Sequence, residues 1–311
     1  MKLFFAPMQG YTDWVYRKIH NEIVGGLDAY FIPFLRLDGG KVRNKDKRDI
    51  CREHNEGVCV VPQVIASGRE EVAALADVIL EQGFDRVDLN LGCPFPLQTG
   101  RGRGAAALRY PEKVRDMLEE LRTRDGLKVS VKMRMGMDDE AEGSAVVELL
   151  NDYELEYITI HPRLGIQQYK GTVDRMAFGR LMELSRHKVV YNGDVTSVEQ
   201  IAGVLENFPG LYGVMMGRSL LGRPSLAREW RDGREWTMDE RWDVSMRMHD
   251  RLYDYACRVL HGEQQILARM RAFWEYQEPL LGKKVYKRLM KTGSLKNYEE
   301  SISAYMTETH F

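Results

Sequence analysis

The stretch Arg86-Val-Asp-Leu-Asn-Leu-Gly-Cys-Pro94 decides the fold class and locates the chemistry of this chain. Hydrophobic residues interrupted by polar ones run into Gly92, which is typical of a strand, and Pro94 stops the hydrogen-bonding ladder just after Cys93. A cysteine at the carboxyl tip of a parallel strand lies where α/β barrels carry their functional groups. The thiol can act there as a nucleophile, a metal ligand or a proton donor.

Other short apolar runs resemble this strand, and each is followed by turn residues and then by a helical pattern. Eight strands alternating with helices predict an α/β protein with a (β/α)8 TIM barrel. The alternative is an open doubly wound sheet, which would usually place a glycine-rich fingerprint after its first strand, and none is there. The predicted strands are residues 3–6, 29–34, 58–64, 86–91, 128–134, 157–161, 188–192 and 213–217, and the predicted helices include 69–82, 111–124, 142–153, 178–185 and 197–206.

The strand signals stop near Pro224, and the rest of the chain has helical patterns only. We predict a catalytic barrel over residues 1–232 and a second, all-α domain over residues 233–311. The helices expected in this second domain are 238–260, 264–275, 283–290 and 294–305, separated by glycines.

Composition excludes several classes of protein. Lys and Arg number 45 against 46 Asp and Glu, so nucleic acid would have to bind a local basic patch. No run approaches the roughly 20 apolar residues that span a bilayer. The four cysteines, at positions 51, 59, 93 and 257, form neither a Cys-x-x-Cys pair nor a zinc-ligand spacing. We expect a soluble, cytoplasmic monomer that holds no metal and stays away from membranes.

Polar residues at the strand tips suggest a cofactor. Lys132 and His161 would face the mouth of the barrel, where a cation and an imidazole suit a flavin ring that gains negative charge on reduction, and Gln63 could bond its edge. The segments Asn192-Gly-Asp194 and Gly217-Arg218 match a barrel phosphate site, because glycine lets backbone N–H groups approach closely. Each residue also has a structural alternative: Lys132 as a surface residue and His161 as a structural hydrogen bonder.

Six segments, in order along the barrel, resemble the motifs of the dihydrouridine synthases. They are Ala6-Pro-Met-Gln-Gly-Tyr-Thr-Asp13, Leu89-Asn-Leu-Gly-Cys-Pro94, Val131-Lys-Met-Arg-Met-Gly136, Ile160-His-Pro-Arg163, Asn192-Gly-Asp194 and Gly213-Val-Met-Met-Gly-Arg218. The resemblance implies an FMN enzyme that reduces uridine in RNA, usually tRNA, with NADPH, and it implies that Cys93 is the catalytic acid. It also implies FMN contacts from Pro7, Met8, Gln9, Gln63, Lys132, His161, Asn192, Gly193, Asp194, Gly217 and Arg218.

The implied chemistry assigns a role to the thiol. Hydride from N5 of reduced FMN would reach C6 of uracil, and Cys93 would protonate C5, because an unperturbed thiol is mostly protonated at neutral pH. Asn90 could hold the base edge, while Arg134 and Arg163 could hold a carbonyl or a phosphate. The uridine must be flipped out of its stack to reach the flavin.

The chain departs from the family pattern in two places. The family often has a lysine three residues after the cysteine, where this chain has Pro96, and Arg101 and Arg103 are candidates to supply the missing charge. The histidine of an Arg-Lys-His pattern near the C-terminus is absent from Met270-Arg-Ala-Phe-Trp274. These departures leave the RNA target and the modified position open.

Two basic patches are candidate RNA surfaces, although each could equally be a solvated face. Residues 36–52 hold seven Lys or Arg against three Asp. Near the C-terminus, Tyr286 and Tyr298 are candidates for base stacking. The cations nearby fall at helical spacing: Lys283, Lys284, Lys287, Arg288 and Lys291.

Two other functions compete with this hypothesis. One is a flavoprotein that acts on a free pyrimidine, resembling the dihydroorotate dehydrogenases, although a free base would need neither the helical domain nor its basic face. The other is an RNA-binding protein without turnover, against which the presence of Cys93, Lys132 and His161 argues.

Overall fold

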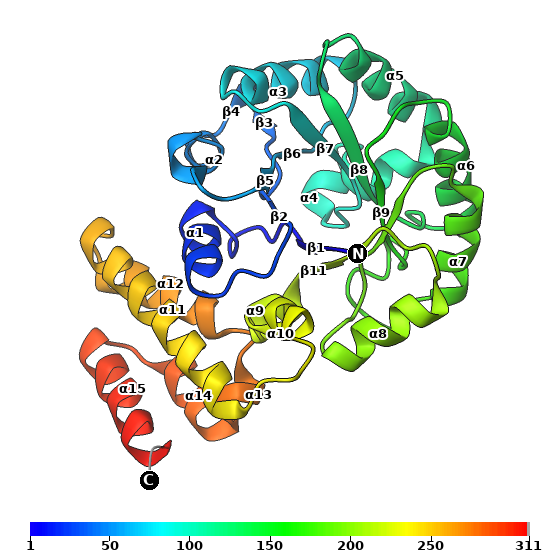
Figure 1. Ribbon diagram of the computed structural model, residues 1–311. Coiled ribbons are helices and arrows are strands. Elements are labelled where there is room, and N and C mark those ends of the chain that lie inside the picture. The colour runs from blue at the N-terminus through cyan, green and yellow to red at the C-terminus, as the bar shows by residue number, and fades with distance from the viewer. Residues whose placement is uncertain (310–311) are drawn as a thin grey trace.

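The computed structural model describes residues 1–309 and confirms the (β/α)8 barrel. Pro62, which has no N–H to donate, divides the third predicted strand into β5 (Val60–Val61) and β6 (Gln63–Val64). Because β5 pairs with one neighbouring strand and β6 with the other, the parallel sheet closes on itself (Figure 1). The remaining barrel strands are β1 (Lys2–Phe5), β2 (Ala29–Phe31), β7 (Arg86–Leu91), β8 (Lys128–Arg134), β9 (Ile158–His161), β10 (Val189–Tyr191) and β11 (Gly213–Met216).

Helices surround the closed sheet, and side-chain caps start several of them. The Asp13 carboxylate accepts from the Tyr16 N–H, and Asp174 and Ser197 cap later helices in the same way. The sequence pattern located all of these helices but the first. They are α1 (Trp14–Ile23), α3 (Arg69–Glu81), α5 (Pro111–Arg122), α6 (Glu140–Leu150), α7 (Arg175–Leu184) and α8 (Val198–Asn207).

Aromatic residues form a separate buried cluster among the strands. Phe4 stacks on Tyr157 at 5.4 Å between ring centroids and meets Phe31 edge-on at 5.8 Å. All three are buried, and the strand loops at the carboxyl ends remain free to form a site.

The strand loops carry further short elements. A hairpin of β3 (Leu37–Asp38) and β4 (Lys41–Val42), with α2 (Asn44–Asp49) and η1 (Glu53–Asn55), follows β2. The loop after β7 contains α4 (Pro96–Thr99) and η2 (Gly104–Arg109). After β11 come α9 (Arg218–Gly222) and α10 (Leu226–Asp232).

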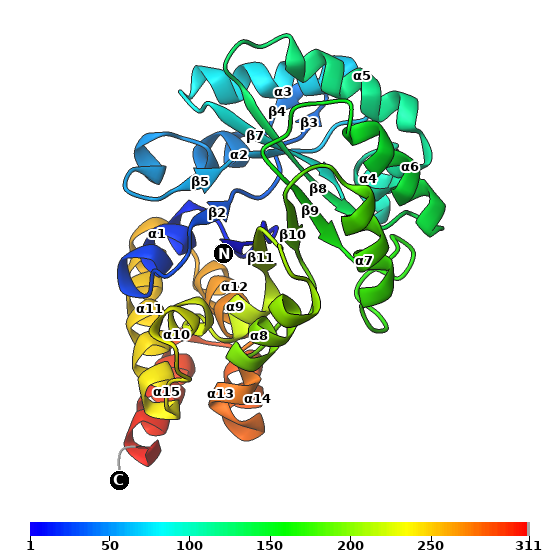
Figure 2. The same ribbon diagram turned by 45° about the vertical axis from the view of Figure 1, so that its right-hand side comes forward.

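The C-terminal region is helical and packs against α1 (Figure 2). The Arg269 guanidinium bonds both oxygens of the Asp13 carboxylate at 2.7 Å, which ties this region to the start of α1. The proposed division at 232/233 stays a prediction, and residues 310–311 lie outside the described residues. The elements are α11 (Met238–Val259), α12 (Glu263–Trp274), α13 (Glu278–Leu281), α14 (Lys283–Lys291) and α15 (Leu295–Thr309).

Tyr298 belongs to the core of this helical region. The side chain is 1 % exposed, and its hydroxyl accepts a hydrogen bond from the Trp274 indole at 2.8 Å. The prediction that Tyr298 stacks on bases was therefore wrong. None of the helices within residues 1–309 is long and apolar enough to cross a membrane.

Candidate active site

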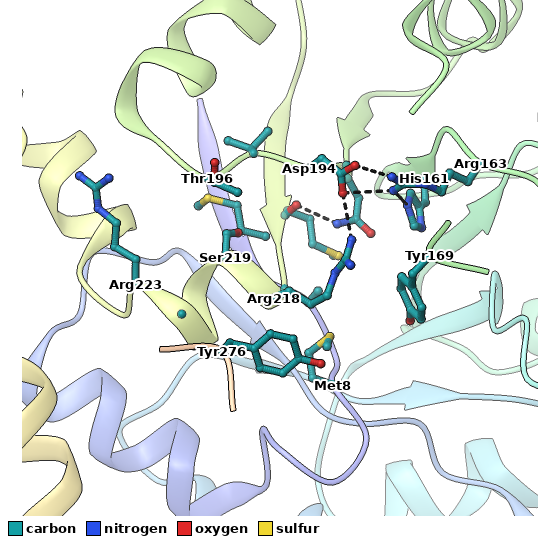
Figure 3. A pocket seen from close by; sticks show the side chains of 18 of the residues that line it. Met8, His161, Arg163, Tyr169, Asp194, Thr196, Arg218, Ser219, Arg223 and Tyr276 are labelled. Carbon is teal, nitrogen blue, oxygen red and sulfur yellow. Dashed lines mark hydrogen bonds and ion pairs between the residues drawn. The ribbon is translucent and has the colours of Figure 1, made fainter. Parts of the chain in front are cut away.

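A cavity of about 740 Å³ opens at the carboxyl ends of the barrel strands (Figure 3). The cavity is large enough for a cofactor, since such sites measure roughly 300–1,000 Å³. Nine of the residues that the resemblance assigned to FMN line it: Pro7, Met8, Lys132, His161, Asn192, Gly193, Asp194, Gly217 and Arg218.

One side of the cavity is built around the Asp194 carboxylate. It accepts hydrogen bonds from Arg218 at 2.9 Å and from Arg163 at 3.1 Å (Figure 3). Burial alone would raise the pKa of Asp194, but the hydrogen bond and charge of Arg163, with the charge of Arg218, lower it below its usual range. The carboxylate therefore stays ionised and fixes two guanidinium groups, which leaves one net positive charge for an anion.

Two glycines that line the cavity leave little room for a side chain. A Cβ on Gly193 would lie 2.9 Å from the Val173 side chain, and one on Gly217 would lie 3.0 Å from the Met8 sulfur. The Asn192 amide donates to the Met215 carbonyl at 2.8 Å and holds the tips of β10 and β11 together. Short loops after the last two strands, followed by a short extra helix, are the usual phosphate site of such barrels.

His161 is neutral, and its tautomer can be assigned. Burial, together with the charges of nearby arginines and Lys132, keeps the pKa of His161 well below its usual value. Arg163 lies 3.2 Å from Nε2, and a guanidinium can only donate, so Nε2 accepts and Nδ1 carries the hydrogen. Burial and the charge of Arg134 also lower the pKa of the half-buried Lys132 to about 8, although Asp88 opposes this.

A chain of buried hydrogen bonds, which we call the amide relay, leads from Asp88 to Cys93. The Asp88 carboxylate can only accept, so Gln63 turns its NH2 to Asp88 and its oxygen to the NH2 of Asn90, both at 2.7 Å. The Asn90 oxygen then accepts from the N–H groups of Gly92 and Cys93 at 3.0 and 2.9 Å. The orientation of each amide is therefore set by the carboxylate at one end and the backbone at the other.

The Cys93 thiol is held in its protonated form. The side chain is 7 % exposed, and burial raises its pKa above the usual value. The Phe95 N–H and the charges of Arg134, Lys132 and Arg36 oppose this increase but do not cancel it. Such a thiol is a proton donor at neutral pH whose conjugate base would be stabilised by three cations.

The loop after Cys93 folds back onto it. The Ala105 N–H donates to the Cys93 carbonyl at 3.0 Å. Gly104 has a φ of +62°, and a Cβ there would lie 2.6 Å from the same carbonyl oxygen, so only glycine fits. Arg134 closes the other side by donating to the Gly92 carbonyl at 3.0 Å.

Several predicted contacts are not brought to the cavity. Gln63 is fully buried and belongs to the amide relay, and Gln9 donates to the Phe34 carbonyl outside the cavity. Arg103 is buried and paired with Glu71, so the expectation that it reaches RNA does not fit its position. Arg163 lines the cavity but is committed to Asp194, and Asn90 faces the Cys93 backbone.

The predicted basic surfaces are mostly exposed. Arg101 is exposed on the loop after β7, and most cations of residues 36–52 are exposed as well. Two of the three aspartates in that segment are buried, so the exposed charge there is mainly positive. Among the side chains that the structure describes, residues 1–304, no carboxylate forms an ion pair with the exposed cations of α14, namely Lys283, Lys284, Lys287, Arg288 and Lys291.

Two tyrosines that sequence reasoning missed also line the cavity. Tyr169 lies in the loop after β9, with Arg218 at 4.9 Å and Arg134 at 5.4 Å from its ring centroid. Its position in a loop after a strand tip was a usable signal. Tyr276 comes from the helical region, and no local pattern indicates that it reaches the barrel.

The fold and the site define a (β/α)8-barrel protein with a cofactor-sized, positively charged cavity and, outside its lining, a buried thiol on which the charge of the lining residue Lys132 acts. The family model described as Dihydrouridine synthase (Dus) matches residues 4–309, so the chain belongs to the dihydrouridine synthase family. The chain is 28% identical over 231 residues to tRNA-dihydrouridine synthase B of Escherichia coli strain K12, covering 73% of this chain and 70% of that one. It is 26% identical over 228 residues to the protein of that name from Pasteurella multocida, covering 73% and 68%.

Solved structures share the barrel fold at low sequence identity. Morphinone reductase superposes with a TM-score of 0.52 and 12% identity, covering 76% of this chain and 87% of that one. The old yellow enzyme from Trypanosoma cruzi gives a TM-score of 0.53 and 13% identity, covering 76% and 89%. At this identity the likeness shows the fold alone.

Proposed function

We propose that this protein reduces uridines of tRNA to 5,6-dihydrouridine, with FMN as cofactor and NADPH as electron donor. Family membership and the relatives named tRNA-dihydrouridine synthase B support the reaction. The observation that carries the mechanism is the protonated, nearly buried Cys93 thiol, surrounded by cations near the cavity.

The residues of the cavity fit FMN. Lys132 and the neutral His161 would lie along the ring, and the backbone of Gly193 and Gly217, with Arg218, would hold the phosphate. Their fit rests on the tight space around Gly193 and Gly217, where a side chain would displace its neighbours, and on the net positive charge around Asp194. When bound, FMN would supply the hydride that NADPH provides and that reduces C6 of the uracil ring.

Cys93 would complete the reduction by moving one proton. As negative charge builds on C5 and the C4 carbonyl of uracil, the S–H bond breaks and a C–H bond forms at C5. Arg134 and Lys132 stabilise the resulting thiolate, which water reprotonates. The amide relay holds the backbone of Cys93 still during this transfer, so Asn90 acts as a positioning residue.

For RNA binding, we propose that residues 1–232 hold the catalytic barrel and that residues 233–311 dock the RNA. The exposed cations of α14, with Arg101 and the basic surface of residues 36–52, would contact phosphates. We further propose that the protein works in the cytoplasm as a monomer.

The test combines colour and turnover. The purified protein should be yellow, and it should form dihydrouridine in tRNA isolated from cells that lack dihydrouridine synthases when NADPH is added. A colourless protein that binds tRNA would favour the RNA-binding alternative. Flavin-dependent turnover of free uracil or orotate, with none on tRNA, would favour the free-pyrimidine alternative.

A further inference from the structure

Four large apolar side chains, which we call the apolar rim, are exposed at the catalytic end of the barrel. Phe95 and Leu97 follow β7 and are 50% and 60% exposed, while Ile166 and Tyr169 follow β9 and are 60% and 41% exposed. The rings of Phe95 and Tyr169 lie 6.3 Å apart. The loops after β7 and β9 lie against each other. A Cβ added to Gly165, in the loop after β9, would lie 3.1 Å from the side chain of Ala105, in the loop after β7.

The apolar rim lies close to Cys93, since the Phe95 N–H bonds the thiol and the charge of Cys93 acts on Tyr169. Phe95 is two residues from Cys93, and Tyr169 lines the cavity. The rings of Phe95 and Tyr169 are neighbours, and contiguous exposed apolar groups mark interaction sites. The rim also occupies the place where the family often has a lysine, since the local sequence is Phe95-Pro-Leu97. This chain therefore carries no positive charge at that position, and exposed apolar side chains stand on either side of it.

The surroundings of the apolar rim are positively charged. Arg101 and Lys170 are exposed on its two loops, and the guanidinium of Arg134 lies over the Tyr169 ring. Arg36 is close enough for its charge to act on Cys93. A ligand that fits must combine negative charge with flat apolar faces, and single-stranded RNA has both.

We propose that the apolar rim is a stacking surface for the bases that flank the flipped uridine. Flipping removes the target from the stack and leaves a neighbouring base with an uncovered face, which Phe95 or Tyr169 can cover. This inference rests on the proposed function and adds its mode of recognition: unpaired loop nucleotides are read by stacking beside Cys93, in addition to phosphate contacts elsewhere.

The test measures binding of FMN-loaded protein to tRNA from cells that lack dihydrouridine synthases, over a series of salt concentrations. Phe95→Ala should weaken binding roughly 5- to 100-fold, as expected for a lost base stack. The slope of log K against log salt should stay the same, whereas Arg101→Ala should reduce it by roughly 0.7 to 0.9. Phe95→Trp should preserve affinity and add tryptophan fluorescence that tRNA quenches.

Two further variants guard against misfolding. Ile166→Ser, on the other loop, should also weaken binding, while Leu80→Ala provides the matched control. Leu80 is an exposed apolar residue near the end of α3, just before β7, and therefore at the opposite end of the barrel. Its substitution should leave tRNA affinity within about twofold, far below the effect of a lost stack.

Different failures have different meanings. If the wild-type protein forms no dihydrouridine in tRNA, the proposed function is wrong. If it does, but Phe95→Ala and Ile166→Ser bind tRNA like the wild type, only the stacking surface is wrong. The stacking surface is also refuted if Phe95→Ala dissociates a protein dimer, or detaches the protein from lipid vesicles, without changing tRNA affinity.

Discussion

Asp88→Asn tests whether the amide relay begins at a buried carboxylate whose ionised form is disfavoured by burial. The side chain is 0 % exposed, and burial raises its pKa from 3.8 to about 6, although hydrogen bonds from Gln63 and Ser130 and the charge of Lys132 oppose this. Asparagine has the same shape. Its oxygen can still accept from Gln63, and its NH2 can donate to Ser130 if that hydroxyl rotates, so the relay keeps its direction.

The magnitude follows from the two pKa values. A group whose pKa is raised on folding binds more protons in the folded state, so its contribution to stability falls as the pH rises between the two values. The difference between 3.8 and about 6, at 1.36 kcal/mol per unit, is about 3 kcal/mol. From pH 4 to pH 6, which covers most of the interval between the two pKa values, the unfolding free energy of Asp88→Asn relative to the wild type should therefore rise by about 2 kcal/mol. Lys132 stays charged throughout this range.

The assay is urea unfolding of the cofactor-free proteins, followed by tryptophan fluorescence at several pH values. Asp85→Asn is the matched control, because a hydrogen bond from Lys128 lowers the pKa of that exposed carboxyl. Because the pKa of Asp85 is lowered on folding, the stability of Asp85→Asn relative to the wild type should fall as the pH rises, mostly below about pH 4, and it should change little from pH 4 to pH 6. A difference between Asp88→Asn and wild type that stays constant from pH 4 to pH 6 would refute the raised pKa.

Three more predictions concern the site and the RNA surface. Cys93→Ala should lower uridine reduction about 10²- to 10⁴-fold while NADPH still reduces the bound flavin, because only the proton donor is lost; full tRNA turnover by this variant would remove Cys93 from the acid role. Lys132→Ala and Arg218→Ala should each weaken FMN binding about 10- to 100-fold, as expected for a lost charged hydrogen bond, measured as flavin absorbance per mole of purified protein. Unchanged flavin content in both would contradict the cofactor position. Reversing the charges of Lys283, Lys284 and Lys287 together should raise KM for tRNA and reduce the salt slope of binding by roughly 2. Equal kinetics at physiological salt would exclude α14 as a docking face.

The strand pattern predicted the barrel because both faces of its strands are buried and the turns between elements contain strong stop signals. The bounds of β7 and β8 agree with the prediction to the residue. The third strand differs, since Pro62 divides it, yet the two halves still close the sheet. The cluster of strand-tip residues at the cavity was predictable for the same reason, because parallel strands bring their carboxyl ends to one edge.

The sequence pattern did not predict which side chains form hydrogen bonds or ion pairs with one another. Gln63 looked like a cofactor contact, but the strand register places it beside Asp88. Its NH2 donates to Asp88 and its oxygen accepts from Asn90, so both ends of its amide are bonded inside the barrel. Arg103 was a candidate to supply the charge missing at Pro96, but Glu71 on α3 binds it. Tyr298 looked like a stacking residue, but Trp274 lies against it. In each case the partner lies more than 20 residues away along the chain.

The sequence by itself determined the alternation of strands and helices, the strand tips and the position of the thiol, because these depend on local periodicity and on turn residues. Only the tertiary structure decided which of these polar groups face the cavity, that His161 is neutral and that Asp88 orients the loop of Cys93. Burial and charge at a site are sums over neighbours from distant segments, and those neighbours are assembled only when the barrel closes.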